Sequence, residues 1–362
     1  RDVVKMKKIK LKNICNISAG GTPSRSNINY WNNGNIPWCK IGDFSGKYIN
    51  QVKENITEEG LKNSSAKIFK RGTILYTIFA TIGEVAILEK EAATNQAIAG
   101  LEIINNEVDL EYLYYYLKSL KFVMLKKSRG VAQNNINLGI LKNIEIKIPD
   151  KIEQINIAKI LDNIEKIIDK KKKQLKELNT IIKSQFVEMF GTPFLNEKNW
   201  KYGIIKDLVK EVKYGTSKPA NGGKYKYLRM NNITYDGKLD LSEIKYIDIE
   251  EDDKEKYSTK NGDILFNRTN SKELVGKTCV FDIEEEMIIA GFIIRVRINE
   301  FANPYFISEY MNTVYLKEKL RNMCKDASGQ SNINAKELEN IKIYIPPITL
   351  QNQFSEIVKQ ID

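Results

Sequence analysis

Polar turns rich in glycine, asparagine and cationic residues are the parts of this sequence best suited to chemistry. The first half contains Ala19–Arg25 and Pro37–Lys40, and the second half contains Tyr214–Lys218, Arg229–Asn232 and Asn267–Lys272. Arginine can donate two parallel hydrogen bonds to guanine, asparagine and glutamine pair with adenine, and lysine, threonine and backbone N–H groups hold phosphate. Glycine allows the main chain to come close to a ligand. Together these turns favour a surface that reads double-stranded DNA.

We expect the DNA-contacting side chains to come from these turns and from the segments around residues 77, 129–134 and 330. The same residue types also occur in ordinary hydrogen-bonded turns, so the types alone do not separate a DNA contact from a structural one. The predicted DNA-binding residues are Thr22, Ser24, Arg25, Lys40, Thr77, Arg129, Gln133, Asn134, Tyr214, Thr216, Lys218, Arg229, Asn231, Asn267, Arg268, Thr269, Asn270, Lys272, Gln330 and Ser331.

Several classes of catalytic site are excluded by what the sequence lacks. The 362 residues include no histidine, which excludes Ser-His-Asp and Cys-His nucleophiles and histidine-bound metals. The sequence has no phosphate-binding loop of the form Gly-x-x-x-x-Gly-Lys-Ser/Thr and no Gly-x-Gly-x-x-Gly fingerprint. Cys15, Cys39, Cys279 and Cys324 lie too far apart in the sequence for a zinc motif or a disulfide framework. We therefore expect no catalytic residue, metal or cofactor in this chain.

The overall charge is strongly positive. Fifty-seven Lys and Arg against 46 Asp and Glu give a net charge of +11, which favours an anionic partner such as nucleic acid. No apolar run approaches the ~18 residues of a membrane span, and the beginning lacks the apolar core of a signal peptide. Because dispersed cysteines suit a reducing compartment, we expect a cytoplasmic protein without membrane contact.

An internal repeat organises the chain. Residues 133–149 read QNNINLGILKNIEIKIP and residues 330–346 read QSNINAKELENIKIYIP, identical at 10 of 17 positions at an offset of 197. The similarity continues upstream, where residues 71–76 resemble residues 261–266. A period this long predicts two copies of one domain rather than a solenoid. Within each copy, short β-rich runs precede a helical stretch, at 110–127 or 304–323, and a closing strand.

A long helix is predicted between the two copies. Residues 152–189 contain no Gly or Pro, and apolar residues recur at alternating spacings of four and three, as in a coiled coil. One apolar seam needs a partner helix, whereas Lys170–Lys173 suit a solvated face. At the offset of 197, residues 348–361 begin the same helix again, so we expect the natural chain to continue or the missing part to come from elsewhere. The predicted seam residues are Ile157, Leu161, Ile164, Ile168, Leu175, Leu178, Ile182 and Met189.

Several segments resemble the DNA specificity subunits of type I restriction–modification systems, over essentially the whole chain. The helix-to-domain junction is similar in Phe186–Gly191, which leads to Asn199-Trp200. The motifs that resemble target-recognition domains are Gly20–Ser24, Tyr30-Trp31, Ile36–Trp38, Gly42-Asp43 and Ile56–Ala66 in the first copy, and Tyr227–Ile233 and Gly262–Asn270 in the second. The short second helix departs from the family pattern.

The resemblance implies an α+β fold, with two repeated mixed α/β target-recognition domains separated by long antiparallel coiled-coil helices. The expected domains are residues 1–150 and 192–347, with the spacer helix at 151–191 and a second spacer helix beginning at 348–362. Each domain would read one half of a bipartite DNA site. The helices would set the distance between the half-sites and dock methyltransferase subunits, two being expected. S-adenosylmethionine and ATP would bind only to partner subunits, which include a motor–nuclease subunit in the full complex.

Two other classes of protein fit the residues. The chain could be the DNA-recognition portion of a fused restriction–methylation enzyme whose catalytic part preceded Arg1, which upstream sequence carrying a methyltransferase loop would establish. It could also be a coiled-coil scaffold whose basic domains bind protein, which an assay of salt-dependent DNA binding would distinguish.

Overall fold

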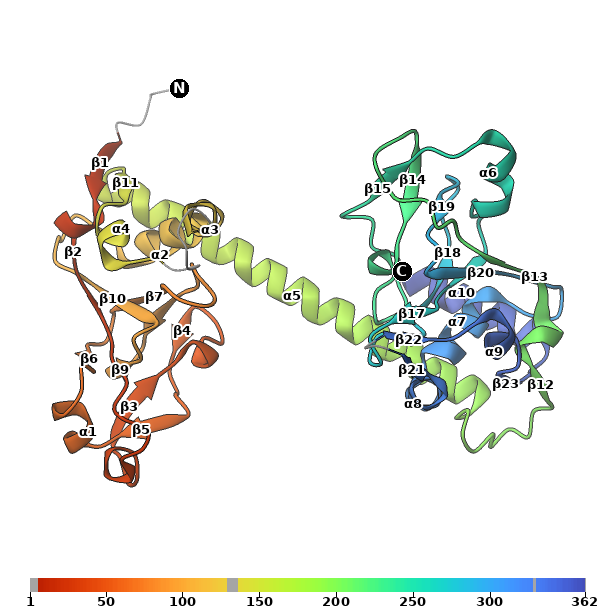
Figure 1. Ribbon diagram of the computed structural model, residues 1–362, viewed down its shortest axis with the longest axis horizontal. Coiled ribbons are helices and arrows are strands. Elements are labelled where there is room, and N and C mark those ends of the chain that lie inside the picture. Colours follow the sequence, from red (N-terminus) through yellow and green to blue (C-terminus); the bar gives the residue numbers. More distant parts are fainter. Residues whose placement is uncertain (1–5, 129–135, 328–329, 362) are drawn as a thin grey trace. The chain divides into compact units, whose positions relative to one another are not determined.

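The computed structural model describes residues 6–128, 136–327 and 330–361, and the chain forms two compact units, residues 1–171 and 172–362 (Figure 1). The side chains of residues 127–128, 325–327 and 330 are not part of the description. Helix α5 (Lys151–Phe190) begins in unit 1 and ends in unit 2, so the predicted long helix is confirmed.

The described strands of unit 1 form a central sheet, a second mixed sheet and a short terminal pair. The central sheet has the order β2-β10-β7-β8-β4, the second sheet the order β5-β3-β9-β6, and β1 pairs with β11. Helices α1 (Glu58–Lys62), α2 (Leu110–Ser119), α3 (Lys121–Ser128) and α4 (Leu138–Lys142) complete the unit. The strands are β1 (Lys7–Lys10), β2 (Cys15–Ala19), β3 (Ile36–Cys39), β4 (Tyr48–Ile49), β5 (Glu54–Ile56), β6 (Ile68–Phe69), β7 (Ile74–Thr77), β8 (Val85–Leu88), β9 (Ala92–Thr94), β10 (Ile98–Ile103) and β11 (Glu145–Ile148).

Unit 2 repeats this plan with different side chains. Its central sheet has the order β13-β20-β16-β18, its second sheet the order β15-β14-β19, and β12 pairs with β23. A small additional sheet has the order β17-β22-β21. The strands are β12 (Tyr202–Ile204), β13 (Val209–Tyr214), β14 (Tyr225–Leu228), β15 (Lys245–Ile247), β16 (Asp263–Asn267), β17 (Thr269–Asn270), β18 (Thr278–Phe281), β19 (Ile288–Ile289), β20 (Ile293–Ile298), β21 (Lys325–Ala327), β22 (Gln330–Asn332) and β23 (Lys342–Tyr344), and the helices are α6 (Glu251–Tyr257), α7 (Pro304–Asn312), α8 (Val314–Met323), α9 (Ala335–Glu339) and α10 (Ile348–Ile361).

The shared strand order confirms the sequence repeat as a structural one. In both units a parallel pair lies in the second sheet, β3 with β9 and β14 with β19. Gly72 and Gly262 both have positive φ, 84° and 88°, in the turn before β7 and β16, a conformation that favours glycine. The expected fold of two repeated mixed α/β domains with a long helix is therefore confirmed.

A buried glutamine closes each unit at the start of its terminal helix. Gln154 donates to the carbonyl oxygens of Glu107 and Pro149, both at 2.9 Å, and accepts from the Asp109 N–H at 2.8 Å. Asp109 is the N-cap of α2, so one side chain ties the start of α5 to the start of α2 and to the end of β11. Gln154 is 0% exposed, which makes its hydrogen bonds costly to lose.

Gln351 makes the equivalent set of hydrogen bonds in unit 2. It donates to Phe301 O at 3.2 Å and Pro346 O at 2.8 Å, and it accepts from the Asn303 N–H at 2.9 Å. Asn303 is the N-cap of α7. The alignment of Gln154 with Gln351 in the sequence therefore corresponds to one interaction that is present twice.

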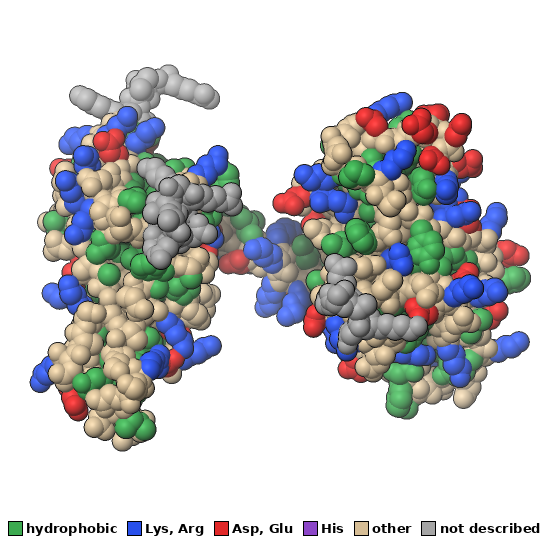
Figure 2. Space-filling view, viewed as in Figure 1, with side chains coloured by type: hydrophobic (Ala, Val, Ile, Leu, Met, Phe, Trp, Pro, Cys, Tyr) green, Lys and Arg blue, Asp and Glu red, His purple; other side chains and the backbone are tan. Residues whose placement is uncertain are grey.

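The predicted seam of α5 is packed at its two ends and exposed between them. Ile157 and Leu161 are half-buried in unit 1, and Ile182 is buried in unit 2, where Leu178 and Met189 are half-buried. The intervening seam residues Ile164, Ile168 and Leu175 are 46%, 46% and 62% exposed. Lys170–Lys173 are exposed as expected, and cationic side chains are visible along this stretch of α5 (Figure 2).

An aromatic cluster that the seam did not include joins α5 to α10. Phe186 and Phe190 are 1% and 0% exposed, and their rings lie 5.6 and 5.5 Å from that of Phe354 in α10. Phe306 of α7 completes the cluster, 4.8 Å from Phe190. The heptad spacing indicated Met189 here. Burial instead follows every fourth residue, at Ile182, Phe186 and Phe190, because this end of α5 packs into a domain core. Pairing of the two helices along the whole seam stays a prediction.

At its other end α5 is fixed to unit 1 by a polar network. The Tyr115 hydroxyl of α2 donates to Asp162 at 2.6 Å and to Glu165 at 2.9 Å, both on α5. Lys47 forms ion pairs with Asp162 and Glu111, and its side chain is only 14% exposed. None of the helices in the described ranges is both long and apolar enough to cross a membrane.

The three hydrogen bonds of the buried Gln351 side chain, here called the glutamine clamp, predict that two substitutions on α10 change the stability of the protein unequally. Gln351→Leu should destabilise the protein by about 2–4 kcal/mol, because it leaves the Asn303 N–H and the carbonyl groups of Phe301 and Pro346 without the partner that they have in the folded protein. Urea unfolding would measure the loss, and hydrogen exchange should accelerate at the start of α7. The control Gln353→Leu changes an exposed residue of α10 and should leave both unchanged. Equal effects of the two variants would contradict a structural role for the clamp.

Candidate nucleic-acid interface

Five of the predicted DNA-binding residues meet in one recess of unit 2. Thr216, Lys218, Arg229, Asn231 and Arg268 contribute to its lining, and its volume is about 470 Å³. The remaining lining is largely apolar and consists of Ser217, Pro219, Ala220, Tyr227, Met230, Ala290, Gly291 and Phe292. A recess that combines apolar walls with a few converging cationic and amide groups suits recognition of a ligand such as a base edge.

Strand ends explain why these residues converge. Arg229 follows β14 directly, Arg268 follows β16, and Thr216 lies two residues beyond the end of β13. The Thr216 N–H donates to Ile289 O and the Ala290 N–H donates to Leu228 O, so β19 joins the two sheets at this point. Side chains beyond the strand ends are therefore held close together although they are far apart in sequence.

Backbone hydrogen bonds on both sides of Arg268 fix its position at the recess. Its N–H donates to Phe292 O at 3.0 Å, and its carbonyl accepts from the Ile333 N–H at 2.9 Å. The guanidinium carbon lies 4.7 Å from the centre of the Tyr214 ring, a cation–π contact. Within the described residues, Arg268 Nε is buried without a hydrogen-bond partner. Since an unpaired buried donor is costly, this geometry favours a ligand that supplies an acceptor.

Arg229 is more constrained than Arg268. One of its terminal nitrogens, Nη2, donates to Glu243 O at 3.0 Å, and its backbone N–H donates to the side chain of Asn232 at 2.9 Å. Its Nε is also buried without a partner in the described structure. Part of the Arg229 donor edge therefore serves the fold.

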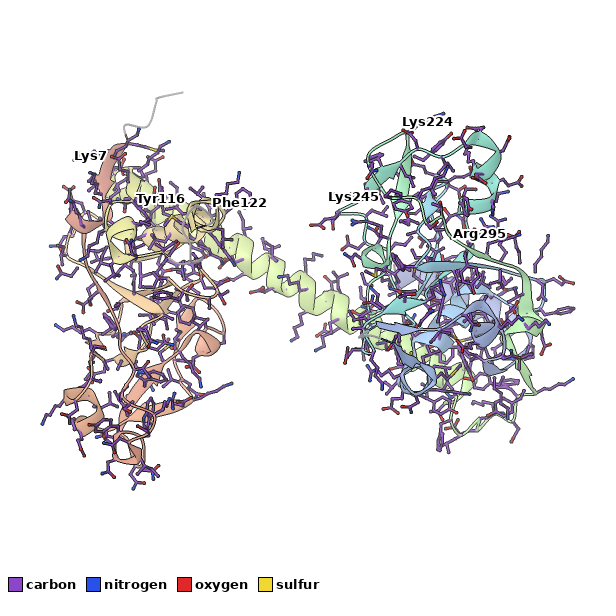
Figure 3. The ribbon with its side chains drawn as sticks, viewed as in Figure 1. Lys7, Tyr116, Phe122, Lys224, Lys245 and Arg295 are labelled. Atoms are coloured by element: carbon purple, nitrogen blue, oxygen red, sulfur yellow. The ribbon has the colours of Figure 1, made fainter. Side chains whose placement is uncertain are left out.

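An ion cluster in the central sheet of unit 2 ties together β13, β16 and β20, and β13 and β16 lead into the recess. Arg295 of β20 is 1% exposed, lies within unit 2 (Figure 3), and donates to Glu211 of β13 at 2.5 Å. Asp263 of β16 lies 3.8 Å from Arg295 Nε and accepts from Arg297 Nε at 3.0 Å. Burial opposes ionisation of Glu211, but the hydrogen bond and charge of Arg295 and the charge of Arg297 outweigh it and lower the pKa of the Glu211 carboxyl.

In unit 1 the predicted DNA-binding residues Arg25 and Lys40 are engaged within the protein. Arg25 lies 3.6 Å above the Trp31 ring and pairs with Glu54 at 2.6 Å, and Lys40 pairs with the other oxygen of Glu54. The hydrogen bond from Lys40 is the largest cause of the lowered pKa of Glu54. Trp38 is buried and packs edge-on against Trp31, at 5.1 Å between ring centres. This arrangement neutralises the cations locally and presents an aromatic cluster with one carboxylate.

Four predicted DNA-binding residues are buried, and the structure corrects their expected place at the surface. Thr77 is 0% exposed, and its hydroxyl accepts from the Glu84 N–H at 2.9 Å. Asn267 is 0% exposed and donates to Met230 O at 3.5 Å. Thr216 is 4% exposed and its hydroxyl accepts from the Lys218 N–H, while Ser331 is 2% exposed and lies in β22. Polar residues at strand ends serve the turn itself, because buried backbone groups there need partners.

The other predicted residues lie at or near the surface. Tyr214 is 40% exposed, and Ser24 and Lys272 are also exposed. Thr22 donates to Gln96, Thr269 donates to Asn332 at 3.3 Å, and Asn270 accepts from the Ser271 N–H. Arg129, Gln133 and Asn134 lie outside the described residues, as does the side chain of Gln330.

The sequence interpretation included the aromatic residue Tyr214 but not two other aromatic residues, one in each unit. Phe292 is 49% exposed at the recess of unit 2, and Trp31 stacks on Arg25 in unit 1. The available signal for Phe292 was an aromatic residue after Gly291, directly before an apolar strand. Aromatic residues in β-rich segments more often lie in the core, so this pattern alone did not indicate a binding surface.

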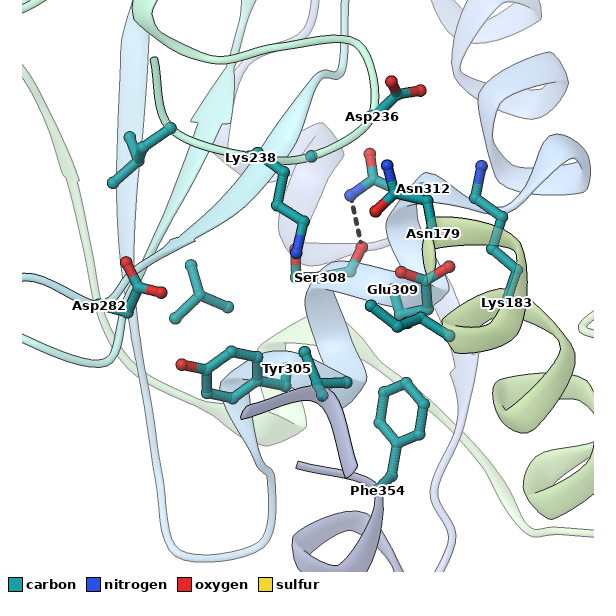
Figure 4. Close-up of a pocket in the computed structure, with 15 residues that line it drawn as sticks. Asn179, Lys183, Asp236, Lys238, Asp282, Tyr305, Ser308, Glu309, Asn312 and Phe354 are labelled. Atoms are coloured by element: carbon teal, nitrogen blue, oxygen red, sulfur yellow. Dashed lines mark hydrogen bonds between the residues drawn. The ribbon is translucent and has the colours of Figure 1, made fainter. Parts of the chain in front are cut away.

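A second recess of unit 2 is too small to hold a nucleotide. It has a volume of about 60 Å³ and lies between α5, α7, α10 and the turn at residues 236–239 (Figure 4). Asn312 donates there to Ser308 O at 2.9 Å, and Lys183 and Asp236 lie at its edge. This recess is a gap between packed helices, since its volume suits a few water molecules.

Comparison with known proteins gives consistent findings. A family model described as the type I restriction modification DNA specificity domain matches residues 3–180 and 197–362. The chain is 35% identical over 214 residues to the type I restriction enzyme MjaIX specificity subunit of Methanocaldococcus jannaschii, covering 57% of this chain and 48% of that protein. It is 26% identical over 253 residues to the EcoKI specificity subunit of Escherichia coli, covering 65% and 53%. The chain spans about half the length of the curated relatives it matches.

Solved structures show the same fold. The S subunit of a type I restriction–modification system from M. genitalium matches with a TM-score of 0.55 and 17% identity, over 100% of this chain and 90% of that one. A second chain, from a study of complex assembly in the type I R-M system, matches with a TM-score of 0.51 and 16% identity, over 100% and 91%.

The ion cluster predicts a pH-dependent stability effect. Glu211→Gln should lower the free energy of unfolding by about 1–2 kcal/mol at pH 7. The loss is no larger because Asp263 still faces Arg295 and because Glu211 is partly exposed. Because the pKa of the Glu211 carboxyl is lowered in the folded protein, its charged form stabilises the fold at pH values above the unfolded pKa of about 4.3. This stabilisation is lost as the pH falls through the folded pKa. The deficit of the variant should therefore close below about pH 4. Urea unfolding across pH would measure it, with Glu300→Gln, an exposed carboxyl of unit 2, as control. A deficit independent of pH would contradict the charge argument.

Proposed function

The chain belongs to the family of type I restriction–modification DNA specificity domains, and we propose that it is the sequence-specific DNA-binding specificity subunit of such a complex. Each unit reads one half of a bipartite double-stranded DNA site. The observation that carries this proposal is the recess of unit 2, in which Lys218, Arg229, Asn231 and Arg268 converge from separate strand ends. The net charge of +11 supports attraction to the DNA backbone.

The second part of the proposal concerns the partners. The long helix docks methyltransferase subunits, two in the full assembly, and a motor–nuclease subunit joins for cleavage. The exposed apolar side chains of Ile164, Ile168 and Leu175, on a helix fixed at both ends, support a docking role. Apolar residues at helical spacing that no domain covers are typical of a surface that another helix buries.

The third part is that the chain itself is not catalytic. S-adenosylmethionine and ATP bind to the partner subunits, and the target is an adenine methylated by those partners in the cytoplasm. The absence of histidine and of the common nucleotide-binding motifs from the sequence supports this assignment.

Domain exchange tests the independence of the two units. Replacing residues 195–345 with the matching domain of a relative should change one half of the recognised sequence and leave the other half and the spacing unchanged. The physical reason is that each unit has its own core and its own polar turns. Methylation mapping in cells that also carry the partner subunits would measure the site. If both halves changed together, the two units would not read DNA independently.

Assays of the purified chain test its proposed place in the complex. The full chain should bind duplex DNA with an affinity that falls steeply as salt increases, because phosphate contacts release counterions. With S-adenosylmethionine but without partners it should transfer no methyl group to DNA. Methyl transfer by the chain alone, or binding that does not respond to salt, would overturn the proposal.

A further inference from the structure

Beside the recess of unit 2, a set of backbone hydrogen bonds, here called the frame, occurs again at the equivalent position of unit 1. In unit 2, the Arg268 N–H donates to Phe292 O and the Ile333 N–H donates to Arg268 O. In unit 1, the same two bonds run from Ile78 to Ala97 O at 2.8 Å and from Ile136 to Ile78 O at 3.0 Å. Arg268 therefore corresponds in space to Ile78, and Phe292 corresponds to Ala97.

A third pair of positions belongs to the same frame. Tyr214 is opposite Ile294 in the pairing of β13 with β20, and Ala19 is opposite Ala99 in the pairing of β2 with β10. The next residue is glycine in both units, and its N–H donates to the carbonyl of Ile293 in unit 2 and of Ile98 in unit 1. The triad Tyr214, Arg268 and Phe292 in unit 2 thus replaces Ala19, Ile78 and Ala97 in unit 1.

The backbone conformation of this frame is restricted in both units by a close contact at a glycine. The two units therefore differ there in the side chains that the frame carries. A Cβ atom at Gly215 would lie 2.2 Å from Ile289 O, and one at Gly20 would lie 2.2 Å from Thr94 O. Both contacts are far below van der Waals distance and involve backbone oxygen atoms, so only glycine fits. The same close approach in both units indicates that the scaffold is kept while the residues that it presents differ.

In unit 2 the triad orients one guanidinium, whose Nε has no hydrogen-bond partner among the described residues. Tyr214 accepts a hydrogen bond from the Ala335 N–H at 2.7 Å, which fixes the ring over which Arg268 lies. Arg268 is half-buried and lines the recess, and Phe292 closes one side of it. A phosphate contact needs no such fixed plane, whereas the parallel acceptors O6 and N7 of guanine do. Lys218, exposed at the same recess, suits the neighbouring phosphate.

We propose that Arg268 reads a guanine in the half-site of unit 2, with Tyr214 as its positioning residue, and that unit 1 reads no base from the equivalent position. This inference rests on the proposed function. It adds the identity of one recognised base, the residue that reads it and a physical reason why the two half-sites differ.

Selection from a DNA library tests the inference. The full chain with its partner subunits is incubated with duplexes randomised in both half-sites, and bound sequences are counted. Wild type should require guanine at one position of the unit 2 half-site. Arg268→Lys, which keeps the charge but loses the planar pair of donors, should reduce that preference about 10- to 100-fold and leave other positions unchanged. Arg71→Lys, at an exposed arginine of unit 1 outside the predicted DNA-binding residues, is the matched control and should retain the guanine preference.

A base analogue tests direct contact. Replacing that guanine with 7-deazaguanine, which lacks N7, should weaken wild-type binding about tenfold or more and should have little further effect on Arg268→Lys. Tyr214→Leu should relax selection at the same guanine only, and Tyr214→Phe, which retains the ring, should preserve it. Thermal unfolding of each variant identifies changes due to folding.

The outcomes separate the inference from the function on which it rests. Selective binding by wild type with an unchanged guanine preference in Arg268→Lys would overturn the inference alone. The same follows if 7-deazaguanine weakens both proteins equally. No sequence selection by the wild-type complex would overturn the proposed function together with the inference.

Discussion

The buried glutamine at the start of each terminal helix is the interaction on which the arrangement of each unit depends. Gln154 and Gln351 are fully buried. Gln154 joins the end of β11, the N-cap of α2 and the start of α5, and Gln351 joins the end of β23, the N-cap of α7 and the start of α10. Because each glutamine lacks alternative partners once buried, the three segments must meet at one point. The short strand pairs β1–β11 and β12–β23 close each unit beside it. Each unit is thereby complete in itself, which allows two copies to diverge separately.

Divergence has altered the electrostatics of the two units in opposite ways. In unit 1, Glu54 holds Arg25 and Lys40, and the tryptophans cover the resulting pair. In unit 2 the carboxylates Glu211 and Asp263 pair with Arg295 and Arg297 of β20, while Arg268 lines the recess. Carboxylates that pair with other arginines leave the charge of Arg268 to meet a DNA ligand, whereas a carboxylate that pairs with the predicted DNA-binding cations themselves offsets their charge.

The long helix combines two kinds of burial. Its first turns are held by polar contacts, in which the Tyr115 hydroxyl and Lys47 meet Asp162, and its last turns are held by Phe186 and Phe190. Between them, apolar seam residues stay exposed beside a run of lysines. A helix of 40 residues without Gly or Pro within it remains continuous there because its packed ends supply the costly nucleus and each further residue adds a backbone hydrogen bond.

The sequence by itself determined the duplication, the long helix and the family. These features are written in local patterns, since the repeat at 133–149 and 330–346, the heptad spacing and the Gly-rich turns need no knowledge of distant contacts. It could not separate Arg268 from Asn267, adjacent residues of suitable type, one of which lines the recess while the other is 0% exposed. It likewise missed Phe292 and the correspondence of Arg268 with Ile78. Only the tertiary structure decided these points, because burial and convergence at strand ends depend on pairings between residues far apart in the chain, such as Arg268 with Phe292 and Ile333.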